Sequence, residues 1–360
     1  MGSFCCGSIL YMTVVKSSEN DLAARLLSRL LRRDQRTFMP NDGLLFVIGS
    51  FVAASAAKVE RFPRPGESMT ANAFALEPGG KGLNLAVACR RLGTQVDGIV
   101  PIGDDMLSGL AASALDRAGL PGKMLRRLPG PTGAGIGFID AQGENCLAVF
   151  PGANGRLSAE DVREKRSAIA RADITMAQFE VGDAPIIAAF EIARDAGRAT
   201  LLNPSPLRPL DPRLLALTTI LVVNANEAAD LASDLAGVGR PSFDAELTDA
   251  GLGEIQALAE AIMARGPAIV VATLGRGGAV FCRSGQPPFH QPSFPVVAVD
   301  TLGAGDAFAA GLAVSLAEGQ SPENAMAFAS ACGAILASTW GVFDAFPDRA
   351  AVEALLRAHR

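Results

Sequence analysis

The sequence predicts an α/β protein with a doubly wound, mostly parallel β-sheet, helices on both faces of it, and a second, smaller β-sheet. From Leu44 onward, short continuous apolar runs alternate with longer stretches that favour helices. The runs lack the polar alternation of half-exposed strands, so they are typical of strands buried on both faces. They cover residues 44–48, 98–102, 173–177, 199–202, 220–223 and 268–272.

Composition limits the class of protein. The chain has 360 residues, 49% of them apolar, a net charge of −5 and a pI near 5.3. It carries no basic stripe of the kind that binds nucleic acid, and no apolar run long enough to cross a membrane. Its six cysteines include no pair with metal-ligand spacing, which favours small core residues of a protein in a reducing cytoplasm.

We divide the chain into a leader, residues 1–42, and one large α/β domain, residues 43–360. Leucines and arginines alternate through residues 21–36, so we expect the leader to be poorly ordered or a lone amphipathic helix. Met39 offers an alternative translation start. The first six residues resemble a myristoylation signal, but Cys6 replaces the required Ser or Thr.

Polar residues follow the predicted strands. Gly49-Ser50, Gly103-Asp104, Gln178 with Glu180, Asn203 and Asn224 each stand at the end of an apolar run, and Thr273-Leu-Gly275 ends the last of these runs. In open α/β sheets, ligands bind beyond the carboxyl ends of the strands. This row of polar groups therefore predicts a binding cleft along that edge.

The segment from Asp300 to Phe308 carries the strongest chemical signal. It reads Asp-Thr-Leu-Gly-Ala-Gly-Asp-Ala-Phe, and it joins an apolar run at 295–299, expected to be a strand, to a helix-like run at 308–318. A turn this rich in small residues can direct backbone N–H groups at an anion. Only two histidines exist, His290 and His359, so acid–base chemistry falls to carboxylates. Asp306 beside an anion site indicates phosphoryl transfer to a hydroxyl.

A second motif, Pro78-Gly-Gly-Lys-Gly-Leu-Asn84, precedes a small-residue helix that we place at 85–92, with Gly93 ending it. Its glycines allow close approach of backbone to a ligand, and Lys81 and Asn84 supply hydrogen-bond donors suited to sugar hydroxyls. It is not a Walker A loop, because no Ser or Thr follows the lysine.

Two segments interrupt the alternation of strand and helix. Residues 67–76 and 133–150 contain Thr, Phe, Ile and Val with turn residues between them, which predicts a small β-layer outside the main sheet. Such a layer could act as a lid that excludes water from a phosphotransfer site.

The two motifs, in this order and separation, resemble those of the ribokinase-like (PfkB) carbohydrate kinases, over residue 44 to the C-terminus. The resemblance implies Asp306 as catalytic base and an anion hole from Gly303, Ala304, Gly305 and the Asp306 amide. It implies that the acceptor is contacted by Gly80, Lys81, Asn84, Glu180 and Asp306. The segment Pro151-Gly-Ala-Asn154 also fits the family pattern. For ATP it implies Asn224, Thr273, Gly275, Gly277 and Gly305, with Glu227 organising Mg²⁺ through water.

The resemblance also leaves open a monovalent-cation site, for K⁺, at Asp300 and Leu302, and a homodimer formed through the lid. Asp300 could equally be a cap at the end of a strand. Ala345 stands where the family often has a serine near the cation, which weakens the case for K⁺.

One departure concerns the acceptor. The family usually has Asn and Asp shortly after the Gly-Ser that follows the first strand, where this chain has Val52 and Ala54. A charged hydrogen bond contributes about 1.5 to 3 kcal/mol, so ribose in the usual pose is expected to bind poorly.

We therefore expect ATP-dependent phosphorylation of a primary hydroxyl of a sugar or sugar-like substrate. One alternative is a kinase for a nucleoside or another non-ribose acceptor. The other is a catalytically weak, ligand-binding relative, which the intact Asp300 to Asp306 segment argues against.

Overall fold

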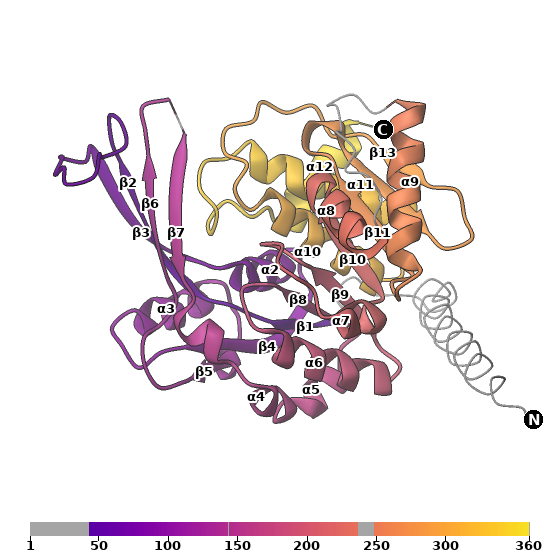
Figure 1. Ribbon diagram of the computed structural model, residues 1–360, viewed down its shortest axis with the longest axis horizontal. Coiled ribbons are helices and arrows are strands. Elements are labelled where there is room, and N and C mark those ends of the chain that lie inside the picture. The colour runs from indigo at the N-terminus through magenta and orange to yellow at the C-terminus, as the bar shows by residue number, and fades with distance from the viewer. Residues whose placement is uncertain (1–42, 143, 237–247, 360) are drawn as a thin grey trace, which may run out of the picture.

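The computed structural model describes residues 43–142, 144–236 and 248–359 (Figure 1). The expected leader and most of the glycine-rich stretch at 237–253 lie outside the described residues. The Gly- and Asp-rich composition of 237–253 predicts a surface loop, which is wrong for residues 249–253, because they belong to a helix, α9 (Asp249–Met263).

The large sheet confirms the predicted fold class. Its nine strands lie in the order β13-β12-β11-β10-β9-β8-β1-β4-β5 and are parallel except for β12 and β13, which pair antiparallel at one edge. The strands are β1 (Leu44–Ile48), β4 (Gln95–Ile102), β5 (Leu125–Arg127), β8 (Ile174–Gln178), β9 (Ala199–Asn203), β10 (Ile220–Asn224), β11 (Ile269–Thr273), β12 (Ala279–Arg283) and β13 (Phe289–Gln291).

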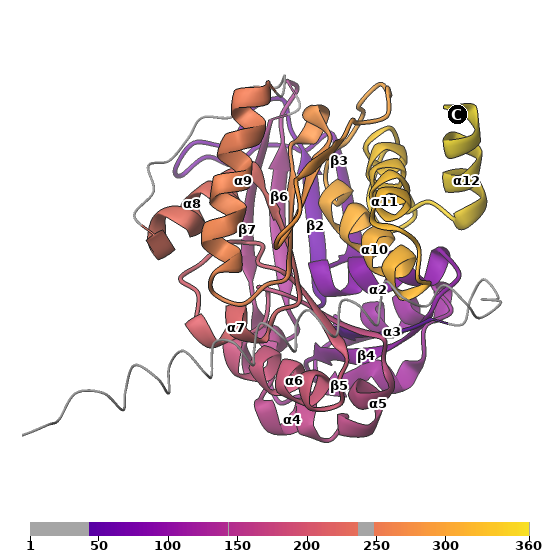
Figure 2. The ribbon, with the colours of Figure 1, turned by 90° about the vertical axis from the view of Figure 1, so that its right-hand side faces the viewer.

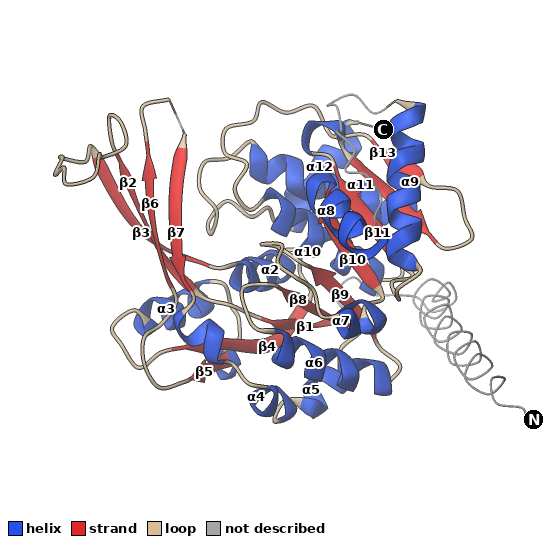
Figure 3. Ribbon diagram, in the orientation of Figure 1, coloured by secondary structure: helices blue, strands red, loops and turns tan. Residues whose placement is uncertain are grey.

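Helices bury both faces of this sheet (Figures 2 and 3). On β1, Leu45 and Val47 join one core cluster while Phe46 and Ile48 join the other, as the period of two requires. The first cluster includes α2 (Lys81–Arg91), α3 (Ser108–Arg117), α10 (Ala304–Ala317), α11 (Pro322–Ala337) and α12 (Arg349–Ala358). The second includes α4 (Ala159–Arg163), α5 (Arg166–Arg171), α6 (Asp183–Asp195), α7 (Pro212–Leu217), α8 (Ala225–Ala236) and α9.

The small sheet stands beside the helical body, in the order β3-β2-β6-β7 (Figure 1). Its strands are β2 (Val52–Lys58), β3 (Ala73–Gly79), β6 (Ala134–Ile139) and β7 (Asn145–Phe150). The sequence placed a strand at 67–76, which is wrong for 67–72, and it missed β2. The alanines of β2 have weak strand propensity, and pairing with β3 and β6 fixes the strand instead.

The two faces of the small sheet differ in what they meet. Lys58 extends its ammonium to 4.1 Å from the ring centre of Trp340, which follows α11. Residues alternate between faces, so Val52, Ala54 and Ala56 share this body-facing side, the inner face. Register places Phe74, Leu76, Ile136 and Phe150 together on the opposite side, the outer face, where all four are exposed.

The predicted strand at 295–299 is wrong, because residues 292–299 form no strand. The N–H groups of Val299 and Asp300 both donate to the Ala337 carbonyl at the end of α11, which holds this segment against a helix rather than a strand. In the described part of the chain, no helix is long and apolar enough to span a membrane.

Candidate active site

The turn before α10 exposes the start of a buried helix. Gly303 precedes α10 with φ of +79°, and a Cβ there would lie 2.9 Å from Val342 Cγ1, so only glycine fits without strain. The Ala304 N–H donates to the Thr301 carbonyl, whereas those of Gly305 and Asp306 have no protein acceptor among the described residues. The Gly303 N–H likewise has none there, so of the four predicted amides those of Gly303, Gly305 and Asp306 remain free to meet an anion, with the helix dipole behind them.

Asp306 lies in the first turn of α10, with only 3% of its surface exposed. Asn84 Nδ2 donates to its Oδ2 at 2.8 Å, and Lys81 Nζ lies 3.7 Å from its Oδ1. The carboxylate is held from two sides, at the point where the helix presents free N–H groups. Asn84 Oδ1 is buried with no partner among the described residues, so it can accept a bond from a ligand.

Lys81 and Asn84 belong to α2, which begins at Lys81 rather than at the expected residue 85. Gly80 precedes the helix with φ of +102°. The Leu83 N–H donates to the Ser50 carbonyl at 3.0 Å, and a Cβ on Gly82 would lie 2.0 Å from the Ser50 nitrogen. The glycines thus let the helix start pack directly on the end of β1.

Glu180 follows β8 and lies beside the start of α2. Its Oε2 accepts the Ser50 hydroxyl at 2.6 Å and the Lys81 N–H at 2.8 Å. Burial raises the pKa of this carboxyl, and these two donors oppose the rise. Asn154, by contrast, bonds both the N–H and the carbonyl of Phe51, so its contact is with the backbone between β1 and β2.

A pocket of about 330 Å³ opens along the carboxyl edge of the large sheet. Of the predicted site residues, Lys81, Asn224, Glu227, Thr273, Asp300, Leu302, Gly303, Gly305 and Asp306 line it. Gly80, Asn84, Glu180 and Ala304 adjoin it through the contacts above. Gly275 and Gly277 lie in a short 3-10 turn after β11, outside the lining. Sequence reasoning missed Ser205 and Thr301, and the sequence Asn203-Pro-Ser205 at a strand end was a usable signal for the first.

Asn224 and Glu227 begin α8 with two reciprocal bonds. The Asn224 N–H donates to Glu227 Oε2 at 2.9 Å, and the Glu227 N–H donates to Asn224 Oδ1 at 2.8 Å. Burial raises the pKa of the Glu227 carboxyl, while hydrogen bonds from the Asn224 backbone and the Ser205 side chain lower it. Part of the sequence signal here is therefore helix capping.

Asp300 forms a turn cap. Its Oδ1 accepts the Leu302 N–H at 3.0 Å, and the Leu302 side chain is 64% exposed. The pocket lining contains three carboxylates, on Glu227, Asp300 and Asp306, against the single ammonium of Lys81, a formal charge of −2 when all are ionised. An anionic phosphate chain would be repelled there without a counterion.

The donor set suits Mg²⁺ brought in by a nucleotide. No group of three or more His, Cys, Asp or Glu residues among the described residues forms a metal site. Mg²⁺ keeps several waters and takes few protein carboxylates, with phosphate oxygens completing its shell. Glu227 and its oxygen-bearing neighbours fit that mode of binding.

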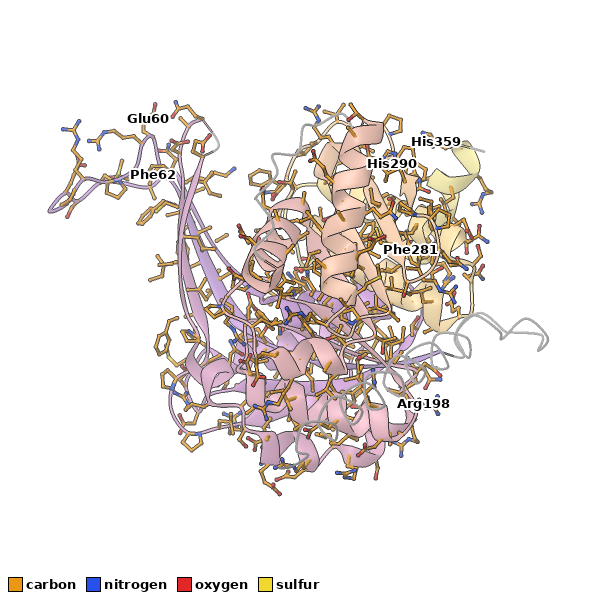
Figure 4. All side chains as sticks on the ribbon, turned by 45° about the vertical axis from the view of Figure 1, so that its right-hand side comes forward. Glu60, Phe62, Arg198, Phe281, His290 and His359 are labelled. Carbon is orange, nitrogen blue, oxygen red and sulfur yellow. The ribbon has the colours of Figure 1, made fainter. Side chains whose placement is uncertain are left out.

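Neither histidine contacts this site. His290, on β13, places Nε2 2.6 Å from the Gly277 carbonyl oxygen, and His359 packs edge-on against Phe294. Both lie in the C-terminal part of the fold, away from the small sheet whose tip carries Glu60 and Phe62 (Figure 4).

A helix N-terminus with free amides, a buried aspartate beside it and a polar strand edge define a phosphotransferase of the α/β class. The model of the pfkB family of carbohydrate kinases matches residues 42–349. The chain belongs to this family, and it is a kinase by class.

Several known proteins are similar. The ribokinase of Bacillus subtilis is 30% identical over 310 residues, 86% of this chain and 98% of the relative. A deoxyribokinase of Salmonella typhi is 31% identical over 265 residues, 73% and 82% of the two chains. The chain spans about half, 55%, of the bifunctional ribokinase/ribose-5-phosphate isomerase A of Fructilactobacillus sanfranciscensis, at 32% identity and with 86% of this chain covered.

Among solved structures, Arabidopsis thaliana ribokinase complexed with ribose and ATP aligns with a TM-score of 0.78 and 28% identity. The alignment covers 88% of this chain and 99% of that one.

Proposed function

We propose that this kinase transfers the γ-phosphoryl group of ATP to a primary hydroxyl of a pentose or a similar small acceptor. The observation that carries the proposal is the buried Asp306 carboxylate, held by Asn84 beside the free amides of Gly305 and Asp306. The ribokinase and deoxyribokinase relatives support a pentose as the acceptor.

In this mechanism Asp306 orients the acceptor hydroxyl and accepts its proton. The hydroxyl oxygen forms a bond to the γ-phosphorus while the bond from that phosphorus to the bridging oxygen of ADP breaks, and ADP keeps the electron pair. The amides of Gly305 and Asp306 and the Lys81 ammonium stabilise charge on the transferring group. An aspartate suffices as base because the transition state is loose and the proton leaves late.

Mg²⁺ would neutralise phosphate charge, with Glu227 placed to hold its waters. The carboxylate excess in the pocket supports a requirement for it.

The test is an acceptor panel with purified protein, ATP and Mg²⁺, in which ADP release is followed. We expect saturable turnover with at least one of ribose, 2-deoxyribose and adenosine. Asp306→Asn should lower kcat by about 10³-fold, a typical acid–base contribution, while ATP still binds. If the panel raises ATP consumption nowhere but one compound stabilises the fold, the ligand-binding alternative replaces this proposal.

A non-ribose acceptor is the second candidate. Val52 and Ala54 lie on the inner face, and Val52 is buried, so neither can hydrogen-bond an acceptor hydroxyl. Compared with ribose, 2-deoxyribose lacks the 2-hydroxyl and a nucleoside lacks the free anomeric hydroxyl, so each has one hydroxyl fewer to leave without a partner. A higher kcat/KM for 2-deoxyribose or adenosine than for ribose would support it, and the reverse order would reject it.

A homodimer through the outer face is a further part of the proposal. Phe74 is 70% exposed and Ile136 61%, and with Leu76 and Phe150 they make a continuous apolar surface. We expect a dimer in sedimentation velocity and a monomer after Ile136→Glu. A monomeric wild-type protein would reject this arrangement.

Potassium activation stays a prediction. Asp300 Oδ1 already accepts the Leu302 N–H, and Ala345 offers no hydroxyl. Rates in KCl and NaCl at equal ionic strength decide it, and a K⁺ site requires a clear advantage for KCl.

A further inference from the structure

Ser50 is the hub of a closed hydrogen-bond network that joins three elements. It follows β1, is fully buried, and accepts bonds from the Gly82 N–H at 2.9 Å and Gln178 Nε2 at 3.1 Å. Its own proton goes to Glu180 Oε2 at 2.6 Å. The network links the end of β1, the start of α2 and the end of β8.

The direction of each bond follows from the donors. The Gly82 amide and Gln178 Nε2 can only donate, so the Ser50 oxygen accepts both and its single proton is left for Glu180. Gln178 Oε1 in turn accepts the Glu180 N–H, which closes the ring. Glu180 Oε2 also accepts the Lys81 N–H, so this one oxygen takes two donors.

The network leaves one oxygen of Glu180 for another partner. In the described part of the chain, the hydrogen bonds to its carboxylate all end on Oε2. Its neighbours are the Lys81 ammonium and the Asp306 carboxylate, the charged groups that act on it. Oε1 is thus the acceptor atom presented beside the catalytic aspartate.

We infer that Ser50, supported by Gln178, is the positioning residue that fixes Glu180 so that Oε1 binds an acceptor hydroxyl. The inference rests on the proposed function of the site. Ser50 does not touch the acceptor in this arrangement. Its hydroxyl sets both the orientation and the charge of the carboxylate that does.

Ser50→Ala tests this inference. The acceptor KM should rise by about ten-fold or more, the equivalent of one charge-assisted hydrogen bond, while the KM for ATP stays within about two-fold. The probe is whichever of ribose and 2-deoxyribose the wild-type protein phosphorylates with the higher kcat/KM. Ser50→Cys keeps the side-chain size but donates weakly, so it should fall between wild type and alanine.

A pH profile separates positioning from mere structure. The Ser50 hydroxyl lowers the pKa of Glu180, so its loss should move the acid limb of acceptor binding to higher pH. Ser158→Ala is the matched control, because Ser158 also donates to a carboxylate, Asp161 Oδ2, at 2.6 Å, in the capping box of α4. The control should lower thermal stability but leave the acceptor KM and pH profile unchanged.

Calorimetric titration with ribose and 2-deoxyribose keeps this inference distinct from the proposed function. A wild-type protein that binds a sugar without phosphorylating it contradicts the proposed function, and the Ser50 variants then report through their dissociation constants. Either variant matching wild type in acceptor affinity and pH profile would overturn the role of Ser50. If the alanine variant does not fold, the cysteine variant decides.

Discussion

The turn before α10 and the inner face of the small sheet have different parts in the proposed reaction, and they are built differently. The turn works through backbone amides of Gly305 and Asp306 and one buried carboxylate, each fixed by contacts in the body of the fold. The inner face offers the side chains of Val52 and Ala54 from a strand that belongs to a separate sheet. Under the proposed function, phosphoryl transfer depends on geometry that few substitutions can preserve, whereas acceptor choice depends on replaceable side chains.

Gly303→Ala attacks the first region and should give the largest effect. The added Cβ would lie 2.9 Å from Val342 Cγ1, and the backbone there has a φ of +79°, which residues other than glycine rarely adopt. The turn must therefore shift, and the amides of Gly305 and Asp306 change their direction. Loss of an anion-hole donor typically lowers kcat by about 10²-fold or more. Steady-state kinetics measures it.

Gly109→Ala is the control for that substitution. Gly109 lies in α3, and nothing lies within 4 Å of a Cβ placed there. Because Gly109 lies in the first turn of the helix, the substitution should change the stability of the fold by less than about 1 kcal/mol and leave kcat unchanged. Equal kcat for both variants would show that the turn is not the anion hole.

Glu180→Gln should weaken acceptor binding and make the stability of the fold depend less on pH. Burial raises the pKa of this carboxyl in the folded protein above its value in the unfolded chain. The carboxyl therefore contributes most to the stability of the fold below its unfolded-state pKa, and that contribution is lost as the pH rises through its folded-state pKa. A glutamine oxygen can still accept the Ser50 and Lys81 donors. We expect a rise of about ten-fold in acceptor KM, and a melting temperature that falls less than that of wild type between about pH 4 and pH 7.

The thermal measurement can contradict this account on its own. Parallel wild-type and variant melting curves across that pH range would mean that Glu180 carries no cost of burial. A changed KM with parallel curves would then limit its role to the acceptor.

The sequence predicted the buried strands and the place of the turn better than the inner face, for physical reasons. Continuous apolar runs mark strands buried on both faces, and Gly303 marks the turn. The helix expected from residue 308 begins at Ala304, because Ala304 to Asp306 already form the first turn of α10. The helix start at Lys81 was missed because its glycines favour a loop, and contacts from Ser50 and Glu180 stabilise it instead. Residues 295–299 form an apolar run, yet the carbonyl of Ala337 on a distant helix holds them.

The double variant Val52→Asn with Ala54→Asp changes the inner face and leaves the turn before α10 as it is. It restores the polar residues typical of the family to the inner face, so it should raise kcat/KM for ribose relative to 2-deoxyribose by about ten-fold. The kcat with the better acceptor should change little, because no contact of Asp306 is altered. The competing outcome is an equal loss for both sugars, which would place β2 outside the acceptor site.

Lys58 gives the smallest expected effect and reports on the lid itself. Its ammonium lies over Trp340, the only tryptophan of the chain, and this contact joins the inner face to the loop after α11. An exposed cation–π pair contributes about 0.5 to 1 kcal/mol, so Lys58→Ala should raise the acceptor KM by about two- to five-fold if the sheet closes over the site.

Tryptophan fluorescence makes the same variant a direct probe of closure. In the wild-type protein the emission should change when acceptor saturates the site, because the environment of Trp340 depends on where the small sheet lies. Lys58→Ala should reduce that change. Lys123→Ala, which removes an exposed lysine paired with Asp97 instead, should retain it. Identical changes in the two variants would mean that the Lys58 contact does not govern closure. Wild-type emission that stays constant as the acceptor saturates the site would mean that the small sheet keeps one position, and that acceptor choice arises from a fixed wall rather than from a closing lid.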